Sequence, residues 1–276
     1  MPNLRMLLKN IADTATITAS PVAVSTLPVT NLQTQQRKQT FRTTSLASQN
    51  IDLSWSANQS CNMVALPRFN GTTAATVRIY RYSDSAWTTL LDDTTALVAY
   101  STTGLNQLDI DEFQNPDFLV VKNYVKYLSA VTTMKSMRIT LLDAANPAGY
   151  LEASRAMVGS YNEFTYNPFF GGMESSIQDL SKSERADSGS MITDKREKFF
   201  KTSIRAELIP EATDLLWLRA AARYIGLDKD FWISFYPGSG GVLEYYNQAQ
   251  AKFVSIPSFE PNRYGNQRTA FQIEGA

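Results

Sequence analysis

The sequence predicts a mainly β protein, with an N-terminal β-sandwich and a C-terminal β-rich region that contains one packed helix. Short runs rich in Val, Ile, Thr and aromatic residues recur through residues 1–159, separated by Asn, Gly, Pro and Ser. One delimited helix and further β-type runs follow them. Many short strands with turns at this spacing are typical of a sandwich.

The N-terminal strands are predicted from composition and alternation. The clearest runs cover residues 14–18, 50–55, 63–66, 76–82 and 137–142. The run 76–82 alternates strictly, which is typical of a half-buried antiparallel strand. Its two faces carry Val77, Ile79 and Arg81 on one side, and Arg78, Tyr80 and Tyr82 on the other.

A helix is predicted over residues 210–226. Pro210 suits the first turn, acidic Glu211 and Asp214 suit the positive end of the helix dipole, and Gly226 supplies a C-terminal stop. Apolar residues recur at helical spacing and predict a stripe that packs on a sheet: Leu215, Leu218, Ala222 and Ile225. Further strands are predicted at 199–208, 230–236, 242–247, 253–256 and 269–273.

A change in composition near Gly159 predicts two domains, 1–159 and 160–276. The polar stretch 181–190 in the second domain reads as an exposed loop that a partner would order. Its charged and polar members form a candidate assembly loop: Ser183, Glu184, Arg185 and Asp187.

The composition excludes several classes of function. The 276 residues include 26 Lys and Arg, 26 Asp and Glu, no His and one Cys. Without His there is no Ser-His-Asp or Cys-His catalysis and no His-ligated zinc. Without net positive charge, direct binding to nucleic acid is not expected. The single thiol, Cys61, lies in an apolar run and is expected to be buried.

No apolar run approaches the length of a membrane span, and the N-terminal run is too short for the core of a signal peptide. We therefore expect a protein that is made in a cytoplasm and does not cross a membrane.

Acidic pairs are weak candidates for a site. Asp109 and Asp111 share one side of an extended chain and could hold a hard cation, but the further ligands of a loop site are missing, so a solvated turn is favoured. Asp92 and Asp93 have the same weakness. A carboxylate glycosidase stays open as a minor alternative, because a pair of acids has little specificity. No cofactor site is predicted.

Two tryptophans form a candidate glycan platform. The rings of Trp55 and Trp87 could stack on pyranose faces, while core packing is the more common fate of Trp in a sandwich. Core packing is therefore the favoured interpretation for both.

Three parts of the chain carry a resemblance to a known family. Residues 138–159 contain a strand, an Asn146-Pro147-Ala148-Gly149-Tyr150 turn and a second strand that ends in Gly159. Residues 31–44 with 51–55 are similar to the opening of the same domain, and residues 231–237 with the closing strand complete the pattern. The chain resembles tail-tip proteins of long-tailed bacteriophages, of the distal-tail type with a jelly-roll, galactose-binding-like (discoidin-like) sandwich.

The resemblance implies a structural subunit of a homo-oligomeric ring, which joins the tail tube to the baseplate hub of a virion and contacts other tail proteins. It implies a second, β-rich domain for ring assembly, and neither enzymatic activity nor a cofactor. The alternative is a carbohydrate- or receptor-binding module of the host-adsorption apparatus. No glycan-binding signature transfers residue by residue, so only weak glycan binding is expected of the sandwich.

Overall fold

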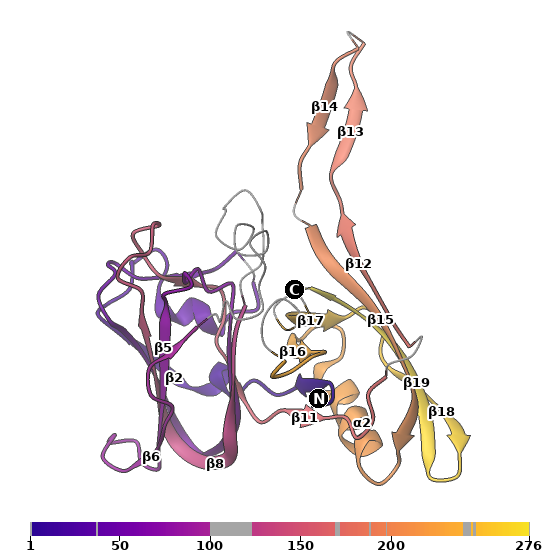
Figure 1. The fold of residues 1–276 in the computed structure, drawn as a ribbon, viewed down its shortest axis with the longest axis horizontal. Helices are drawn as coiled ribbons and strands as arrows, with labels where there is room; N and C mark the ends of the chain where they lie inside the picture. Colours follow the sequence, from indigo (N-terminus) through magenta and orange to yellow (C-terminus); the bar gives the residue numbers. More distant parts are fainter. Residues whose placement is uncertain are drawn as a thin grey trace. The chain divides into compact units, whose positions relative to one another are not determined.

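The computed structural model describes residues 2–36, 38–99, 123–168, 172–187, 189–196, 198–239, 244 and 247–275. The chain forms two compact units (Figure 1). Unit 1 comprises Met1–Glu163 and Phe231–Ala249, and unit 2 comprises Phe164–Asp230 and Gln250–Ala276. Strands dominate both units, so the predicted mainly β fold is confirmed.

The units differ from the predicted domains 1–159 and 160–276 because residues 231–249 return to unit 1. β16 (Phe231–Ser234) pairs antiparallel with β1 (Arg5–Leu7), placing Trp232 opposite Leu7, and β11 (Asn162–Glu163) lies on the other side of β1. β1 and β11 are far apart in the sequence: Arg5 and Glu163, whose side chains are hydrogen-bonded, are separated by 158 positions. A local sequence pattern does not specify such a pairing.

The main sheet of unit 1 has the strand order β10-β4-β8-β5-β6, with β2 beside β4 and β7 beside β5. Unit 1 also contains two short strands that pair with each other, β3 and β9, and two 3-10 helices, η1 and η2. Their bounds are β2 (Thr16–Ser20), β3 (Phe41–Arg42), β4 (Gln49–Pro67), β5 (Thr76–Tyr82), β6 (Leu90–Asp93), β7 (Leu97–Val98), β8 (Asn123–Leu142), β9 (Glu152–Ala153), β10 (Met157–Gly159), η1 (Ile11–Thr14) and η2 (Val29–Gln33).

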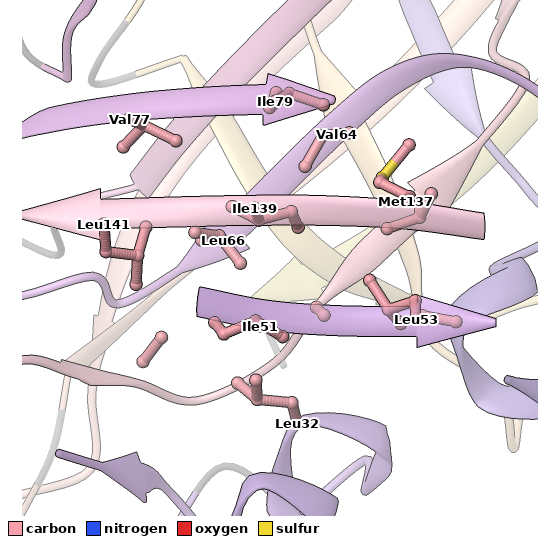
Figure 2. Packing of buried hydrophobic residues seen from close by; sticks show 14 of the residues in the cluster. Leu32, Ile51, Leu53, Val64, Leu66, Val77, Ile79, Met137, Ile139 and Leu141 are labelled. Carbon is pink, nitrogen blue, oxygen red and sulfur yellow. The ribbon is translucent and has the colours of Figure 1, made fainter. Parts of the chain in front are cut away.

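The two longest strands, β4 and β8, build the core of unit 1. Their pairing shifts register between Ser54 and Gln59 and again between Cys61 and Met63. Such shifts bend a strand. Side chains from both halves of β4 therefore meet in one core with β5, β8 and η2 (Figure 2): Leu32, Ile51, Leu53, Val64, Leu66, Val77, Ile79, Met137, Ile139 and Leu141. Burial of each such side chain contributes about 1.5–3 kcal/mol.

The described residues of unit 2 form a sheet with one helix. β19 (Asn266–Gly275) pairs antiparallel with β15 (Lys198–Pro210) and with β18 (Ser258–Arg263), and its last residues pair with the end of β17 (Gln248–Phe253). β12 (Met173–Asp179) pairs with the other side of β15. The helix α2 (Asp214–Ile225) packs against β15.

The helix begins later than residue 210. Pro210 still pairs with Asn266 as the last residue of β15, so the backbone stays extended there and the helix begins at Asp214. Gly226 ends it at a φ of +58°, as a C-terminal glycine does. The predicted apolar stripe is confirmed, because all four of its side chains are buried: Leu215, Leu218, Ala222 and Ile225.

Some of the other strand predictions are confirmed, and one is wrong. The run 76–82 is β5 with identical bounds, and the runs 50–55 and 63–66 both fall within β4. The predicted strand 253–256 is wrong, because β17 ends at Phe253. Most of the predicted strand 242–247 lies outside the described residues, as do Asp109 and Asp111.

The described residues of the polar stretch 181–190 are largely exposed, as predicted, but residues 182–185 form a strand and not a loop. β13 (Lys182–Arg185) pairs with β14 (Met191–Asp194) in a hairpin. The hydroxyls of Ser183 and Thr193 lie 3.0 Å apart across this pair, which is the kind of Ser–Thr cross-strand contact that supports antiparallel strands. No helix in the described part of the chain is long and apolar enough to cross a membrane.

Candidate functional site

One face of the unit 1 sheet points away from the core. β5 alternates as predicted, since its odd-numbered members Val77, Ile79 and Arg81 are buried and its even-numbered members are half-buried. Successive strand residues point to opposite sides of a sheet. We call the side that carries Arg78, Tyr80 and Tyr82 the outer face.

The register of the sheet arranges different chemistries in rows across this outer face. Tyr80 on β5 lies opposite Arg138 on β8, and Arg138 lies opposite Asp52 on β4. An aromatic ring, a cation and an anion therefore stand side by side on three neighbouring strands. In the next row Arg78 lies opposite Thr140, whose hydroxyl donates to Asn50 at 2.7 Å.

Both arginines of the outer face are held by bidentate ion pairs. Arg138 donates from Nε and Nη2 to the two carboxylate oxygens of Asp52, at 2.7 Å each. These hydrogen bonds raise the pKa of Arg138. Arg78 binds both oxygens of Asp93 in the same way, with its Nε 2.8 Å from Oδ1, and holds the pKa of Asp93 below its usual value. Each pair is neutral and presents fixed donors and acceptors.

Three aromatic rings stand beside these ion pairs, and we call them the platform: Tyr80, Tyr82 and Trp87. Tyr80 and Tyr82 have ring centroids 6.5 Å apart and planes inclined by 24°, whereas Trp87 meets Tyr82 edge-on at 5.3 Å. Arg138 lies over the ring of Trp87 at 5.3 Å from its centroid, and Arg78 lies over Tyr80 at 4.7 Å. Cation–π contacts of this kind hold rings and guanidinium groups in register.

A constrained loop holds Trp87 in place. The Asp84 carboxylate accepts hydrogen bonds from the backbone N–H of Thr88 and Thr89, which lower the pKa of Asp84 to about 2. Ser136 donates to the backbone oxygen of Asp84 at 2.6 Å and so ties the loop to β8. Trp87 itself has a φ of +63°. A bulky residue in this left-handed region costs on the order of 1–3 kcal/mol, which the surrounding contacts must offset.

The outer face has the chemistry of a binding surface. Half-buried rings offer apolar area with little loss of side-chain entropy, and the ion pairs offer hydrogen-bond donors and acceptors already oriented by each other. A carboxylate that is bound bidentately still has lone pairs for a ligand hydroxyl. No group of three or more metal-ligating side chains occurs among the described residues.

The two tryptophans of the predicted platform separate. Trp55 is only 4% exposed, and its indole N–H donates to the backbone oxygen of Ile11 at 2.8 Å. A ring enclosed by the core offers no face to a sugar, so Trp55 lies in the core, as the favoured interpretation had it, and does not contribute to a glycan platform. Trp87 is half-buried on the outer face, where its ring contacts Tyr82 and Arg138. The sequence did not indicate these neighbours.

The other candidate residues lie elsewhere. Ser183, Glu184 and Arg185 are exposed on β13 in unit 2, and Asp187 lies in the turn of that hairpin. Asp92 and Asp93 are not a metal pair, because Asp92 binds the buried Arg81 and Asp93 binds Arg78.

Sequence reasoning missed most of the outer face. The alternation in residues 76–82 indicated that Tyr80 and Tyr82 share a side of the strand. Nothing in the sequence indicated that Arg138 and Asp52 lie across from Tyr80, because these partners are 58 and 28 positions away and the register between strands joins them.

The sequence matches no protein-family model and no curated protein. Among solved structures, the chain is similar to the family 32 carbohydrate-binding module of Clostridium perfringens NanJ in complex with galactose, with 10% identity, 58% of this chain and 99% of that chain covered, and a TM-score of 0.38. It is similar to a second C. perfringens family 32 module, in complex with GalNAc-β-1,3-galactose, with 9% identity, coverages of 55% and 100%, and a TM-score of 0.40. A fucose-binding module from Streptococcus pneumoniae gives 11% identity, coverages of 56% and 99%, and a TM-score of 0.39.

Proposed function

We propose that unit 1 is a carbohydrate-binding module without catalytic activity, and that its outer face holds the sugar. The observation that carries this proposal is the placement of Trp87. Its ring stands on a loop that Asp84 and Ser136 fix, in a backbone conformation that costs free energy, next to Tyr82 and Arg138. A core tryptophan has no need of such a loop.

The polar groups of the outer face complement a pyranose. A sugar ring presents apolar C–H groups on its faces and hydroxyls around its rim. Platform rings can stack on the former, while the Asp52 carboxylate accepts from hydroxyls and the Arg138 guanidinium donates to them. Because both ion pairs are neutral, we expect uncharged or weakly charged glycans to bind.

The test is a glycan-array screen followed by calorimetry on the glycans that bind. Trp87→Ala should weaken binding at least about tenfold, equivalent to about 1.4 kcal/mol, because stacking area is lost. Tyr150→Ala is the matched control. The Arg42 guanidinium lies over the Tyr150 ring, 3.9 Å from its centroid, and pairs with Glu152. Tyr150 therefore has a cation–π contact with an ion-paired arginine, as the platform rings do, but lies outside the platform. Binding should survive this control. Equal binding by wild type and Trp87→Ala would contradict the proposal.

A second candidate is the structural role that the resemblance to phage tail-tip proteins implies, a ring subunit in a virion. The hairpin β13–β14 favours it. An isolated two-stranded hairpin is marginally stable in water, yet this one exposes Met191 and Ile192. A neighbouring subunit that covered these side chains would stabilise it. Images of tail particles with ring density for this chain would support the structural role. Absence of the chain from isolated tails would contradict this role.

A further inference from the structure

The strand β12 forms an open edge of the unit 2 sheet. It is the last strand in its sheet, next to β15, and no described strand pairs with its other side (Figure 1). Its seven residues pair with β15 without a register shift. Natural edge strands are protected by charged side chains, especially Lys, by Pro or by a bulge. β12 has no Lys, Pro or bulge, and its charged residues are Glu174 and Asp179.

The backbone groups on the open side can be assigned. Arg205 donates its backbone N–H to the oxygen of Gly172, its direct partner in the antiparallel register. Hydrogen-bonded and non-hydrogen-bonded pairs alternate along an antiparallel ladder. Glu174, Ser176 and Gln178 therefore direct their backbone groups to β15. The odd-numbered members of β12 direct theirs to the open side: Met173, Ser175, Ile177 and Asp179.

An apolar side chain lies on the same strand. Ile177 is 75% exposed, although it stands opposite Phe200 on β15. A run of backbone groups that pair with no described strand, with an exposed isoleucine next to its centre, is a template for strand addition.

We propose that this edge pairs with β12 of a second copy of the chain, antiparallel about a two-fold axis at Ser176. This interface is independent of the proposed glycan binding. In this register Ser175 meets Ile177 of the second copy, Glu174 meets Gln178, and every outward N–H and C=O of the strand has a partner. Ile177 gains Met173 and Ile177 of the second copy as diagonal neighbours, which lie within reach of long side chains.

The charges of β12 select this arrangement over the parallel one. A parallel, in-register pair would set Glu174 against Glu174 and Asp179 against Asp179 of the second copy, and like charges directly opposite destabilise a strand pair. The antiparallel register opposes no like charges. Because seven residues make a small interface, the dimer should dissociate on dilution.

A disulfide across the two-fold axis tests the register in the full chain. Ser176 of one chain would lie opposite Ser176 of the second chain in a non-hydrogen-bonded pair, with the two Cα atoms about 4.5 Å apart. This distance is within the range of a disulfide. Ser176→Cys should therefore give a covalent dimer under mild oxidation. Glu174→Cys is the matched control, because the two Glu174 positions would lie about 13 Å apart along the strands. The native Cys61 is buried and does not compete. Equal cross-linking of both variants, or none with Ser176→Cys, would overturn the proposal.

A second pair of variants tests the edge without a cross-link. Ile177→Pro removes an outward N–H and leaves the bonds to β15 in place, and Ile177→Lys adds the charge that protected edges carry. Both should shift sedimentation of a concentrated sample from dimer to monomer. Ile192→Ala, at an exposed isoleucine on β14, should leave the dimer intact. Wild-type chain that stays monomeric at every concentration, or dimers that survive both Ile177 variants, would overturn the proposal.

Discussion

The inner and outer faces of the unit 1 sheet come from the same strands and have different roles. On β5, Val77 and Ile79 lie in the core, while Tyr80 and Tyr82 alternate with them on the outer face. The two tryptophans illustrate the same contrast, with Trp55 in the core and Trp87 on the platform. An alternating strand can therefore supply stability from one side and recognition from the other, and substitutions should separate the two properties.

Unit 2 differs from unit 1 in what it leaves unprotected. The edge strand β6 of unit 1 has four residues, and its pairing with β5 shifts register between Arg81 and Tyr82. β12 of unit 2 has seven residues and pairs with β15 without a register shift. Side-chain chemistry thus characterises the exposed surface of unit 1, whereas a longer, regular edge strand characterises unit 2.

The largest expected effect is on the inner face. Trp55→Ala should reduce the free energy of unfolding by about 3–5 kcal/mol, as other large truncations in cores do, and it also leaves the Ile11 carbonyl without its indole donor. Thermal denaturation would measure the loss. Trp87→Ala should change stability far less and glycan binding far more. Similar losses of stability in the two variants would break the contrast between the faces.

The helix α2 of unit 2 allows a buried and an exposed side chain of the same type, leucine, to be compared. Leu218 is fully buried and Leu216 is 63% exposed. Leu218→Ala should cost about 2–5 kcal/mol in chemical denaturation, because it leaves a cavity between α2 and the sheet. Leu216→Ala should stay within about 0.5 kcal/mol of wild type, as surface substitutions do. A small effect of Leu218→Ala would show that α2 does not depend on its apolar stripe.

The sequence predicts what depends on local pattern. Alternation in residues 76–82 predicted β5 and the face of each side chain, and helical spacing predicted the stripe on α2. Features that depend on distant partners were missed. The start of α2 shifted because Pro210 pairs with Asn266, and Trp55 and Trp87 could not be distinguished, because only the fold brings Ile11 to one and Arg138 to the other.

A smaller effect on stability is expected from the ion pair of the outer face. The side chains of Arg138 and Asp52 are 35% and 16% exposed, so solvent screens part of their attraction. Asp52→Asn should cost about 1 kcal/mol or less. It should still weaken glycan binding, because the guanidinium loses the carboxylate that orients it towards Trp87. Titration calorimetry beside thermal denaturation measures both. Loss of stability with unchanged affinity would place Asp52 outside the binding surface.

The smallest expected effect is a pH dependence that arises from the loop under Trp87. The backbone N–H groups of Thr88 and Thr89 lower the pKa of Asp84 from 3.8 to about 2. A carboxylate with a depressed folded-state pKa contributes stability above its unfolded value and loses it as pH falls through the folded value. The loop should therefore be intact at neutral pH and loosen between about pH 4 and about pH 2. Asp84→Asn removes this titration. Glycan affinity of wild type should exceed that of Asp84→Asn at neutral pH, and the two should converge as the pH falls, while circular dichroism confirms that both remain folded. A difference in affinity that stays constant across this range would show that the Asp84 charge does not hold the platform.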